Sequence, residues 1–298
     1  MENNMFENIK AKILFGKLLG RPDISKAYKM VPPEDSWYNT ISKVHESLAQ
    51  IQKLPHQSLE IESHDGLKLC GIYYPAAVKS DVTVIAIHGF GSHAEREWAF
   101  PGLFYHSLGL NLLIPYQRAH GPSEGKRITF GALESLDMID WIARVNEITP
   151  DGKIILHGLS MGGGIALQLS AAEMKGVKCS ISDAPSRSIE GFFTNVSRDV
   201  FKGEGDNVAK CAMNDFKKQT GLDARDFDIV ELIKEGKYPI LLSAGSNEHL
   251  EELFDSIKAN NRSETEIIIL DGCNHGNGMY KQTEVYQGKI KEFISKHI

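Results

Sequence analysis

A serine set between glycines is the strongest chemical feature of this sequence. Residues 154–167 read IILHGLSMGGGIAL, with Ser160 flanked by Gly158 and Gly162 in a G-x-S-x-G arrangement. The apolar residues before the serine predict a buried strand, and those after it predict a helix that begins at once. Such a turn leaves no room for side chains at the glycines and projects the serine hydroxyl from the sheet. Because small residues also occur in ordinary strand-to-helix turns, the motif needs support from a base, an acid and an oxyanion site.

A serine hydroxyl is a poor nucleophile at neutral pH, so it needs a base that takes its proton. His275 is the strongest candidate among 11 histidines, because it follows the last predicted strand in the segment LDGCNHG. This position puts it at the carboxyl end of the sheet, the same end as Ser160. A serine followed by an acid and then a histidine is the chain order used on sheets of this kind. We expect His157, on the strand before the elbow, and His88, at the end of an earlier strand, to be buried and hydrogen bonded to the backbone.

The base in turn needs a carboxylate that fixes its tautomer and stabilises the imidazolium. Glu248 is the first acid beyond the strand predicted at 239–244, in the segment AGSNEHL, and it precedes His275 in the chain. Asp183, at the end of the strand predicted after the elbow helix, is the main alternative. Asp271 is a third candidate, close to His275 in sequence. The pattern favours Glu248 and leaves the other two acids open.

A tetrahedral oxyanion must be held by backbone N–H groups. We expect one from Met161, directly after the nucleophile, because free N–H groups and the helix dipole favour negative charge at the start of a helix. We expect the other from Phe90 in the segment HGFGS, which follows a predicted strand that ends at Ile87. Glycines on both sides of Phe90 let its N–H turn toward the same space.

These residues require a sheet that brings several strand ends together. From Ser58 onward, apolar residues alternate with polar ones, which predicts two antiparallel strands joined at 64–66. Short apolar runs and helical patterns then alternate, which is typical of a mostly parallel sheet with helices on both faces. Strands are predicted at 58–63, 67–74, 82–87, 110–114, 153–157, 177–182, 239–244 and 265–270, and helices at 95–108, 130–148, from 161, at 248–260 and at 281–297.

Two segments lie outside this alternation. Residues 185–237 contain several aromatic residues and no clear strand, so we expect a helical cap whose walls set substrate selectivity. Residues 1–55 are predicted as an N-terminal helical extension, in which Pro32 and Pro33 separate two helical patterns. The first pattern, at 2–20, has apolar residues and lysines at helical spacing. We favour a helix packed on the domain surface and keep a membrane-surface anchor as the alternative.

The composition is that of an ordinary globular chain, with 298 residues of which 42% are hydrophobic and 24% charged. A formal net charge of −6 argues against a nucleic-acid partner. Four scattered cysteines indicate reduced thiols and a cytoplasmic protein. No apolar run approaches the ~20 residues that span a bilayer, and no signal peptide is evident. The sequence shows no zinc-helix pattern and no P-loop lysine, so we expect neither a metal nor another cofactor.

Four motifs together resemble those of the α/β-hydrolase-fold serine hydrolases of the bacterial esterase and peptidase-like type: HGFG at 88–91, RAHGPSEG at 118–125, GLSMG at 158–162 and NHG at 274–276. The resemblance extends from about Ser58 to the C-terminus. It implies an α/β-hydrolase domain at 56–298, with a sheet of about eight strands and the cap of about 185–237 between the sixth and seventh strands. It also implies that 118–125 is a structural turn. Where the family most often has an aspartate and a G-D-x-D pattern, this chain has Tyr116 and GSNE at 245–248.

The residues predict a serine hydrolase that cleaves a carboxylic ester through an acyl-enzyme intermediate. Ser160 is the nucleophile, His275 the base and Glu248 the acid, while the N–H groups of Phe90 and Met161 form the oxyanion hole. The expected partner is a small-molecule acyl ester, and a homodimer stays open. Because amide and thioester cleavage use the same groups, a peptidase or a thioesterase is the alternative within the class. A non-catalytic binding protein with the same fold is the alternative outside it.

Overall fold

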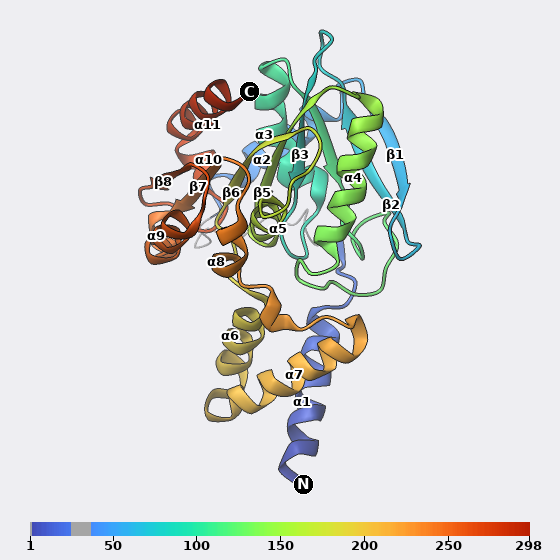
Figure 1. Cartoon of the computed structure of the whole chain (residues 1–298), viewed down its shortest axis with the longest axis vertical. Coiled ribbons are helices and arrows are strands. Elements are labelled where there is room, and N and C mark those ends of the chain that lie inside the picture. Colours follow the sequence, from blue (N-terminus) through green and yellow to red (C-terminus); the bar gives the residue numbers. More distant parts are fainter. Residues whose placement is uncertain (1, 25–36) are drawn as a thin grey trace.

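The computed structural model describes residues 2–24 and 37–298 (Figure 1). Within these residues, one sheet contains the strands β1 (Gln57–Glu62), β2 (Lys68–Tyr74), β3 (Val82–Ile87), β4 (Asn111–Pro115), β5 (Lys153–Leu159), β6 (Val177–Asp183), β7 (Ile240–Gly245) and β8 (Thr265–Leu270). Their order is β1-β2-β4-β3-β5-β6-β7-β8. β2 runs antiparallel to β1 and β4, and the other neighbours are parallel. This is the mostly parallel sheet of about eight strands that the sequence predicts.

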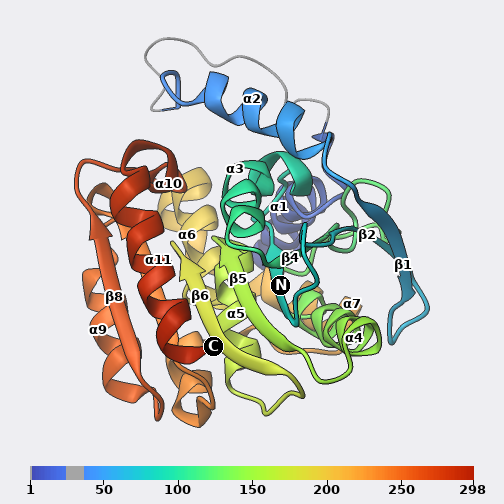
Figure 2. The ribbon, with the colours of Figure 1, turned by 90° about the horizontal axis from the view of Figure 1, so that it is seen from above.

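Helices cover both faces of the sheet (Figure 2). The described helices are α1 (Glu2–Leu18), α2 (Ile41–Ile51), α3 (Ala94–Ser107), α4 (Glu134–Ile148), α5 (Met161–Ser170), α6 (Ile189–Phe201), α7 (Gly205–Thr220), α8 (Ile229–Leu232), α9 (Glu251–Asn260), α10 (Gly278–Lys281) and α11 (Thr283–His297). Residues of α4 and α5 share a core with one face of the sheet, and residues of α3 and α11 share a core with the other. The predicted α/β-hydrolase arrangement, with helices on both sides, is therefore confirmed.

The central strand β3 shows why a continuous apolar run marks a strand buried on both faces. All six of its residues are buried. Ile85 and Ile87 pack in the core on one side of the sheet, while Val84 and Ala86 pack in the core on the other. Successive side chains of a strand point to opposite faces, so a strand between two helical layers needs apolar residues throughout.

Two predicted helices begin later than expected. The helix expected from 130 begins at Glu134, because residues 130–133 form a turn in which Gly131 has a φ of 104°. The helix expected from 248 begins at Glu251, and Ser246–Glu248 form a separate 3-10 turn directly after β7. The second difference matters for the chemistry, because it holds the carboxylate of Glu248 at the end of the sheet.

The segment between β6 and β7 is helical, and α6 and α7 lie together with α1 at one end of the molecule (Figure 1). The inner face of α1 buries Ala11 and Phe15, while Phe6, Ile9 and Ile13 stay exposed. One face of α1 therefore packs on the domain, and the membrane-surface alternative stays a prediction for the other. None of the described helices has the length and hydropathy needed to cross a bilayer. Pro32 and Pro33, predicted to break the chain, lie outside the described residues.

Candidate active site

Ser160 stands at the junction of β5 and α5 with a φ of 59° and a ψ of −115°. A positive φ is strained for a residue with a side chain, and it turns the backbone sharply. Both flanking glycines are required by close backbone contacts: a Cβ on Gly158 would lie 2.0 Å from the carbonyl oxygen of Gly162, and one on Gly162 would lie 2.0 Å from that of Ile87. The N–H of Ser160 donates to the carbonyl oxygen of Asp183 at 2.8 Å. The structure thus contains the tight turn that the glycines predict.

His275 and Glu248 meet at the carboxyl ends of the neighbouring strands β7 and β8. The Nδ1 atom of His275 lies 2.6 Å from Oε1 of Glu248, whose Oε2 accepts the N–H of Gly245 at 2.8 Å. The hydrogen bond with Glu248 raises the pKa of His275 above its usual 6.5, against the opposing effect of desolvation. Because Nδ1 faces the carboxylate, Nε2 is the ring atom that can accept a proton. The pair has the geometry of a base and its orienting acid.

Asp183 and Asp271, the alternative acids, are placed elsewhere. Asp183 contacts Nε2 of His157 at 3.1 Å through Oδ2, and the same oxygen accepts the hydroxyl of Tyr286. Asp271 is exposed, and its backbone carbonyl accepts the side-chain amide of Gln282. Of the three candidate acids, Glu248 is the one hydrogen bonded to His275.

The two strand histidines differ in their partners. His88 is buried, its Nδ1 lies 2.8 Å from the carbonyl oxygen of Gly89, and its Nε2 accepts the N–H of Gln117 at 3.1 Å. The prediction of backbone partners is therefore confirmed for His88. His157 is buried too, but the prediction of a backbone partner is wrong. Its Nδ1 contacts the hydroxyl of Tyr105 of α3 at 2.6 Å, and its Nε2 contacts the carboxylate of Asp183 at the end of the neighbouring strand β6, so side chains contact both ring nitrogens.

The loop at 88–92 leaves one backbone N–H uncommitted. The N–H of Gly89 donates to Oε1 of Glu97 at 2.7 Å, and the N–H of Gly91 donates to Nε2 of His120 at 3.2 Å. Between them, the N–H of Phe90 has no acceptor within the described part of the chain. The N–H of Met161 belongs to the first turn of α5, where backbone donors have no partner inside the helix. Both predicted oxyanion donors are therefore available for a ligand.

Ser160, His275 and Phe90 line one cavity of about 430 Å³. This is a typical volume for a small-molecule site. No hydrogen bond joins the hydroxyl of Ser160 to His275 among the residues that the structure describes. Catalytic hydrogen bonds are often long before substrate binds and tighten in the substrate complex. The cavity brings together the predicted nucleophile, the predicted base and one predicted oxyanion donor.

The walls of this cavity do not come from the predicted cap. Its other lining residues belong to α2 and the residues before it, to the 88–92 loop, to the start of α3, and to the segments around Ser160 and His275: Trp37, Ile41, Val44, Gly89, Gly91, Ser92, Arg96, Glu97, Leu159, Gly276, Met279 and Tyr280. The expectation that 185–237 supplies the selectivity walls is therefore wrong for this cavity. The reason is that α6 and α7 pack on each other and on α1, whereas α2 packs on α3 beside the site.

Glu97 is a site residue that sequence reasoning missed. Its Oε1 accepts the N–H of Gly89, and a Cβ placed on Gly89 would lie 3.4 Å from both Glu97 Oε2 and Ser160 Cβ. Burial raises the pKa of this carboxyl to about 7, although hydrogen bonds from Ser92 and Gly89 oppose the change. The available signal was its place in the first turn of the helix that follows the HGFGS segment. A carboxylate there can reach back to the N–H groups of the preceding loop.

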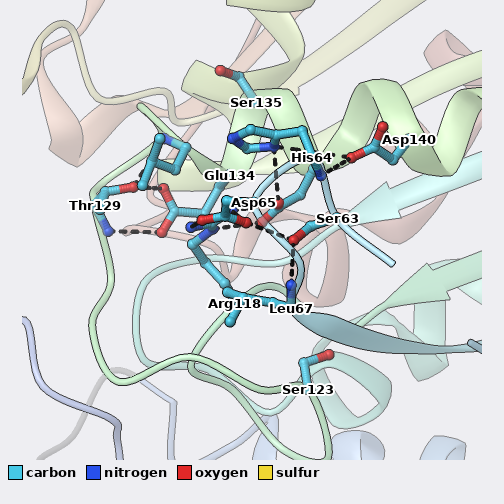
Figure 3. A network of polar contacts seen from close by, with 12 residues as sticks. Ser63, His64, Asp65, Leu67, Arg118, Ser123, Thr129, Glu134, Ser135 and Asp140 are labelled. Atoms are coloured by element: carbon cyan, nitrogen blue, oxygen red, sulfur yellow. Dashed lines mark hydrogen bonds and ion pairs between the residues drawn. The ribbon is translucent and has the colours of Figure 1, made fainter. Parts of the chain in front are cut away.

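The segment 118–125 is a structural turn, as the resemblance implies (Figure 3). The guanidinium of Arg118 donates to both oxygens of Asp65 at 2.9 and 3.0 Å and to both oxygens of Asp137 at 2.7 and 2.6 Å. Its hydrogen bond lowers the pKa of Asp65 to about 2. The hydroxyl of Ser123 accepts the N–H of Cys70 at 2.9 Å, which joins the turn to β2.

Two clusters of acids and histidines bring potential metal ligand atoms within 4.8 Å of one another: His64, Asp137 and Asp140, and Glu264, Glu266 and His297. In the first cluster, Arg118 already occupies both oxygens of Asp137. In the second, Lys296 pairs with both glutamates. Because cations of the protein already neutralise these carboxylates, neither cluster indicates a metal site. The expectation that the protein needs no metal stays a prediction.

Comparison with known proteins agrees with this architecture. The profile of the alpha/beta hydrolase fold matches residues 82–200, which include the elbow and the 88–92 loop. The structure of the Pyrococcus furiosus esterase Pf2001 superposes with a TM-score of 0.65 at 21% identity, over 94% of this chain and 98% of that one. The chain has the α/β-hydrolase fold. Such structural likeness shows the fold of this α/β hydrolase, and its chemistry has to be argued from the site.

Curated relatives match this chain at low sequence identity. It is 26% identical over 262 residues to the uncharacterized protein YqkD of Bacillus subtilis, covering 84% of this chain and 82% of that protein. It is also 28% identical over 125 residues to the monoglyceride lipase of mouse, covering 40% of each chain. These similarities support a hydrolase and do not specify its substrate.

Proposed function

We propose that this protein is a serine hydrolase that cleaves carboxylic esters through an acyl-enzyme intermediate. The observation that carries the proposal is the contact between Glu248 and His275, which lines the same cavity as the strained Ser160. A strained serine alone would be compatible with a packing turn. A histidine oriented by a carboxylate beside that serine has a direct use in nucleophilic catalysis.

The proposed reaction uses each group in a defined role. Nε2 of His275 takes the hydroxyl proton of Ser160 as the oxygen attacks the ester carbonyl carbon. The N–H groups of Phe90 and Met161 hold the oxyanion that forms, and His275 then gives its proton to the departing alcohol. Water deprotonated by His275 attacks the acyl-enzyme and releases the acid, which restores Ser160. Glu248 keeps the Nδ1 proton in place and stabilises the imidazolium in both steps.

The relatives favour an ester over the amide and thioester alternatives. Among them are the esterase of Pyrococcus furiosus and the monoglyceride lipase of mouse, both named for ester substrates. The cavity at Ser160 has apolar walls from Trp37, Ile41 and Met279, which suit a modest acyl group. We expect a short-chain aryl ester to be cleaved faster than the matched thioester or anilide.

Labelling with a fluorophosphonate probe at neutral pH tests the proposal directly. The wild-type chain should be labelled, and Ser160→Ala should not. Ser107→Ala, which changes a serine in α3 that does not line the cavity, should be labelled like the wild type. A folded wild-type chain that resists the probe would refute the enzyme and favour a non-catalytic binding protein with the same fold.

A further inference from the structure

A second, larger cavity lies away from Ser160. It has a volume of about 770 Å³ and is bordered by α1, α6, α7 and the loop from Arg118 to Leu133. It shares no lining residue with the cavity at Ser160. The end of α1 is fastened to this loop, because the carbonyl oxygen of Leu19 accepts the N–H of Ile128 at 2.7 Å. A backbone hydrogen bond therefore joins the end of α1 to the loop, and both border the cavity.

The interior of this cavity is apolar and rich in aromatic rings. Ala11 and Phe15 of α1 face Ala212 and Phe216 of α7, and Phe193 of α6 lies between them. The rings of Phe15 and Phe193 are 4.7 Å apart, and those of Phe193 and Phe216 are 5.7 Å apart. An apolar cavity of this size is in the range that binds small molecules. Its walls favour a hydrocarbon chain.

The opening of the same cavity carries an excess of positive charge. The guanidinium of Arg21 donates to the carbonyl oxygens of Gly121, Ser123 and Gly125, and these are neutral acceptors. Lys126 and Arg127 also line the cavity and are exposed. In the part of the chain that the structure describes, none of these three cations forms an ion pair.

Acidic residues offset only part of this charge. Glu124 accepts the N–H of Lys68, and Asp215 on α7 accepts the side-chain amide of Gln219. Arg21 is held in one orientation by three hydrogen bonds, and a guanidinium has five N–H donors in a planar fork. Toward the described residues 2–24 and 37–298, two of its donors therefore have no acceptor. A fixed guanidinium of this kind matches a carboxylate or a phosphate.

A wall of phenylalanine rings separates this cavity from the catalytic groups. Phe192 stacks on Phe130 at 3.8 Å and lies 5.8 Å from Phe90, whose N–H is a proposed oxyanion donor. On its other side, Phe192 lies 5.8 Å from Phe193 and 6.2 Å from Phe15, which line the second cavity. A ligand in the second cavity would therefore contact the wall and not the nucleophile.

We propose that this second cavity binds a single-chain amphiphile with an anionic head, such as a long-chain fatty carboxylate. The chain lies among Phe15, Phe193 and Phe216, and the head is held at Arg21 near Lys126 and Arg127. The size and apolar walls of the cavity select the chain, and the guanidinium selects the negative head. This site does not depend on the proposed reaction, because none of its residues takes part in it.

Fluorescence titration of the full chain with cis-parinaric acid tests this site. We expect saturable binding of one equivalent, competed by hexadecanoate more strongly than by hexadecanol. Ala212→Trp, which fills the cavity, should weaken binding about tenfold or more, whereas Val44→Trp, a matched change in the catalytic cavity, should leave it unchanged. A melting curve for each variant shows that it is folded.

Arg21→Gln keeps the proposal testable if Ala212→Trp fails to fold, because Arg21 is at the exposed rim. This variant should lose the preference for hexadecanoate over hexadecanol. The proposal is overturned by an absence of saturable binding, or by binding that Val44→Trp abolishes and Ala212→Trp does not affect. It is also overturned if Arg21→Gln keeps the full preference for the carboxylate.

Discussion

Replacing Glu97 by glutamine should make the free energy of unfolding of the protein less sensitive to rising pH. The carboxyl of Glu97 accepts the N–H of Gly89 at 2.7 Å, and burial raises its pKa from 4.5 to about 7. A glutamine has nearly the same shape and keeps an oxygen that can accept the same hydrogen bond, but it cannot ionise. The variant therefore removes the titration of this group and keeps most of its packing.

The sign of the effect follows from which state holds the proton. Between pH 4.5 and about pH 7, the folded chain keeps a proton on Glu97 that the unfolded chain has released. The free energy of unfolding therefore falls as pH rises through this range. At about 1.4 kcal/mol per pKa unit, the difference between the two pKa values corresponds to about 3 kcal/mol lost by pH 8. Below pH 4.5 the carboxyl is protonated in both states, and the loss disappears.

Urea unfolding followed by tryptophan fluorescence at pH 4.5 and pH 8 measures this loss. Stability measured at both pH values for wild type and Glu97→Gln gives a double difference in which the other titrating groups cancel. We expect the wild type to lose about 2–3 kcal/mol more than the variant on going from pH 4.5 to pH 8. Equal losses for the two proteins would refute the burial of this carboxyl beside Ser160.

The remaining predictions concern the triad and the elbow. Glu248→Gln should lower kcat/KM on a short-chain aryl ester by about 10²–10⁴-fold, because a glutamine no longer fixes the tautomer of His275. Asp183→Asn should lower kcat/KM of the folded enzyme by less than about tenfold. A larger loss in Asp183→Asn than in Glu248→Gln would overturn the assignment of the acid. Because the raised pKa of His275 must be exceeded for the imidazole to act as a base, activity should fall on the acid side at a pH above 6.5, and in Glu248→Gln this limb should move to lower pH. Gly162→Ala should abolish fluorophosphonate labelling, since its Cβ would lie 2.0 Å from the backbone oxygen of Ile87. The control Gly288→Ala, whose Cβ would meet nothing within 4 Å, should have a melting temperature no lower than that of the wild type.

The parts of the site that were predictable depend on local backbone geometry. A glycine two residues after Ser160 is needed because the helix start passes against the end of β3, and this constraint is visible as a short motif. Glu248 and His275 each follow the end of a parallel strand, and those two strands are neighbours in the sheet. Strand ends in a parallel sheet converge at one edge, so candidate residues there can be selected without knowing the packing.

The walls of the catalytic cavity were not predictable in this way. Trp37, Ile41 and Val44 reach the site because α2 packs on α3, and a helical pattern does not state which helix it will pack against. Glu97 was missed for a related reason. A charged residue in the first turn of a helix is usually a solvated cap, and its burial depends on residues that arrive from distant parts of the chain.

The packing partner of the helices in 185–237 could not be predicted from the sequence. The length of this segment and its lack of a strand correctly indicate helices, but they carry no information about the element on which those helices pack. In the structure the partner is α1: Phe15 contacts Phe192 and Phe193, and the ion pair between Lys10 and Glu204 joins the same two parts. The cap therefore encloses a cavity together with α1, whereas α2 lines the cavity at the proposed nucleophile Ser160. We therefore expect removal of α1 to expose the phenylalanines of the cap and to leave the contact between His275 and Glu248 intact.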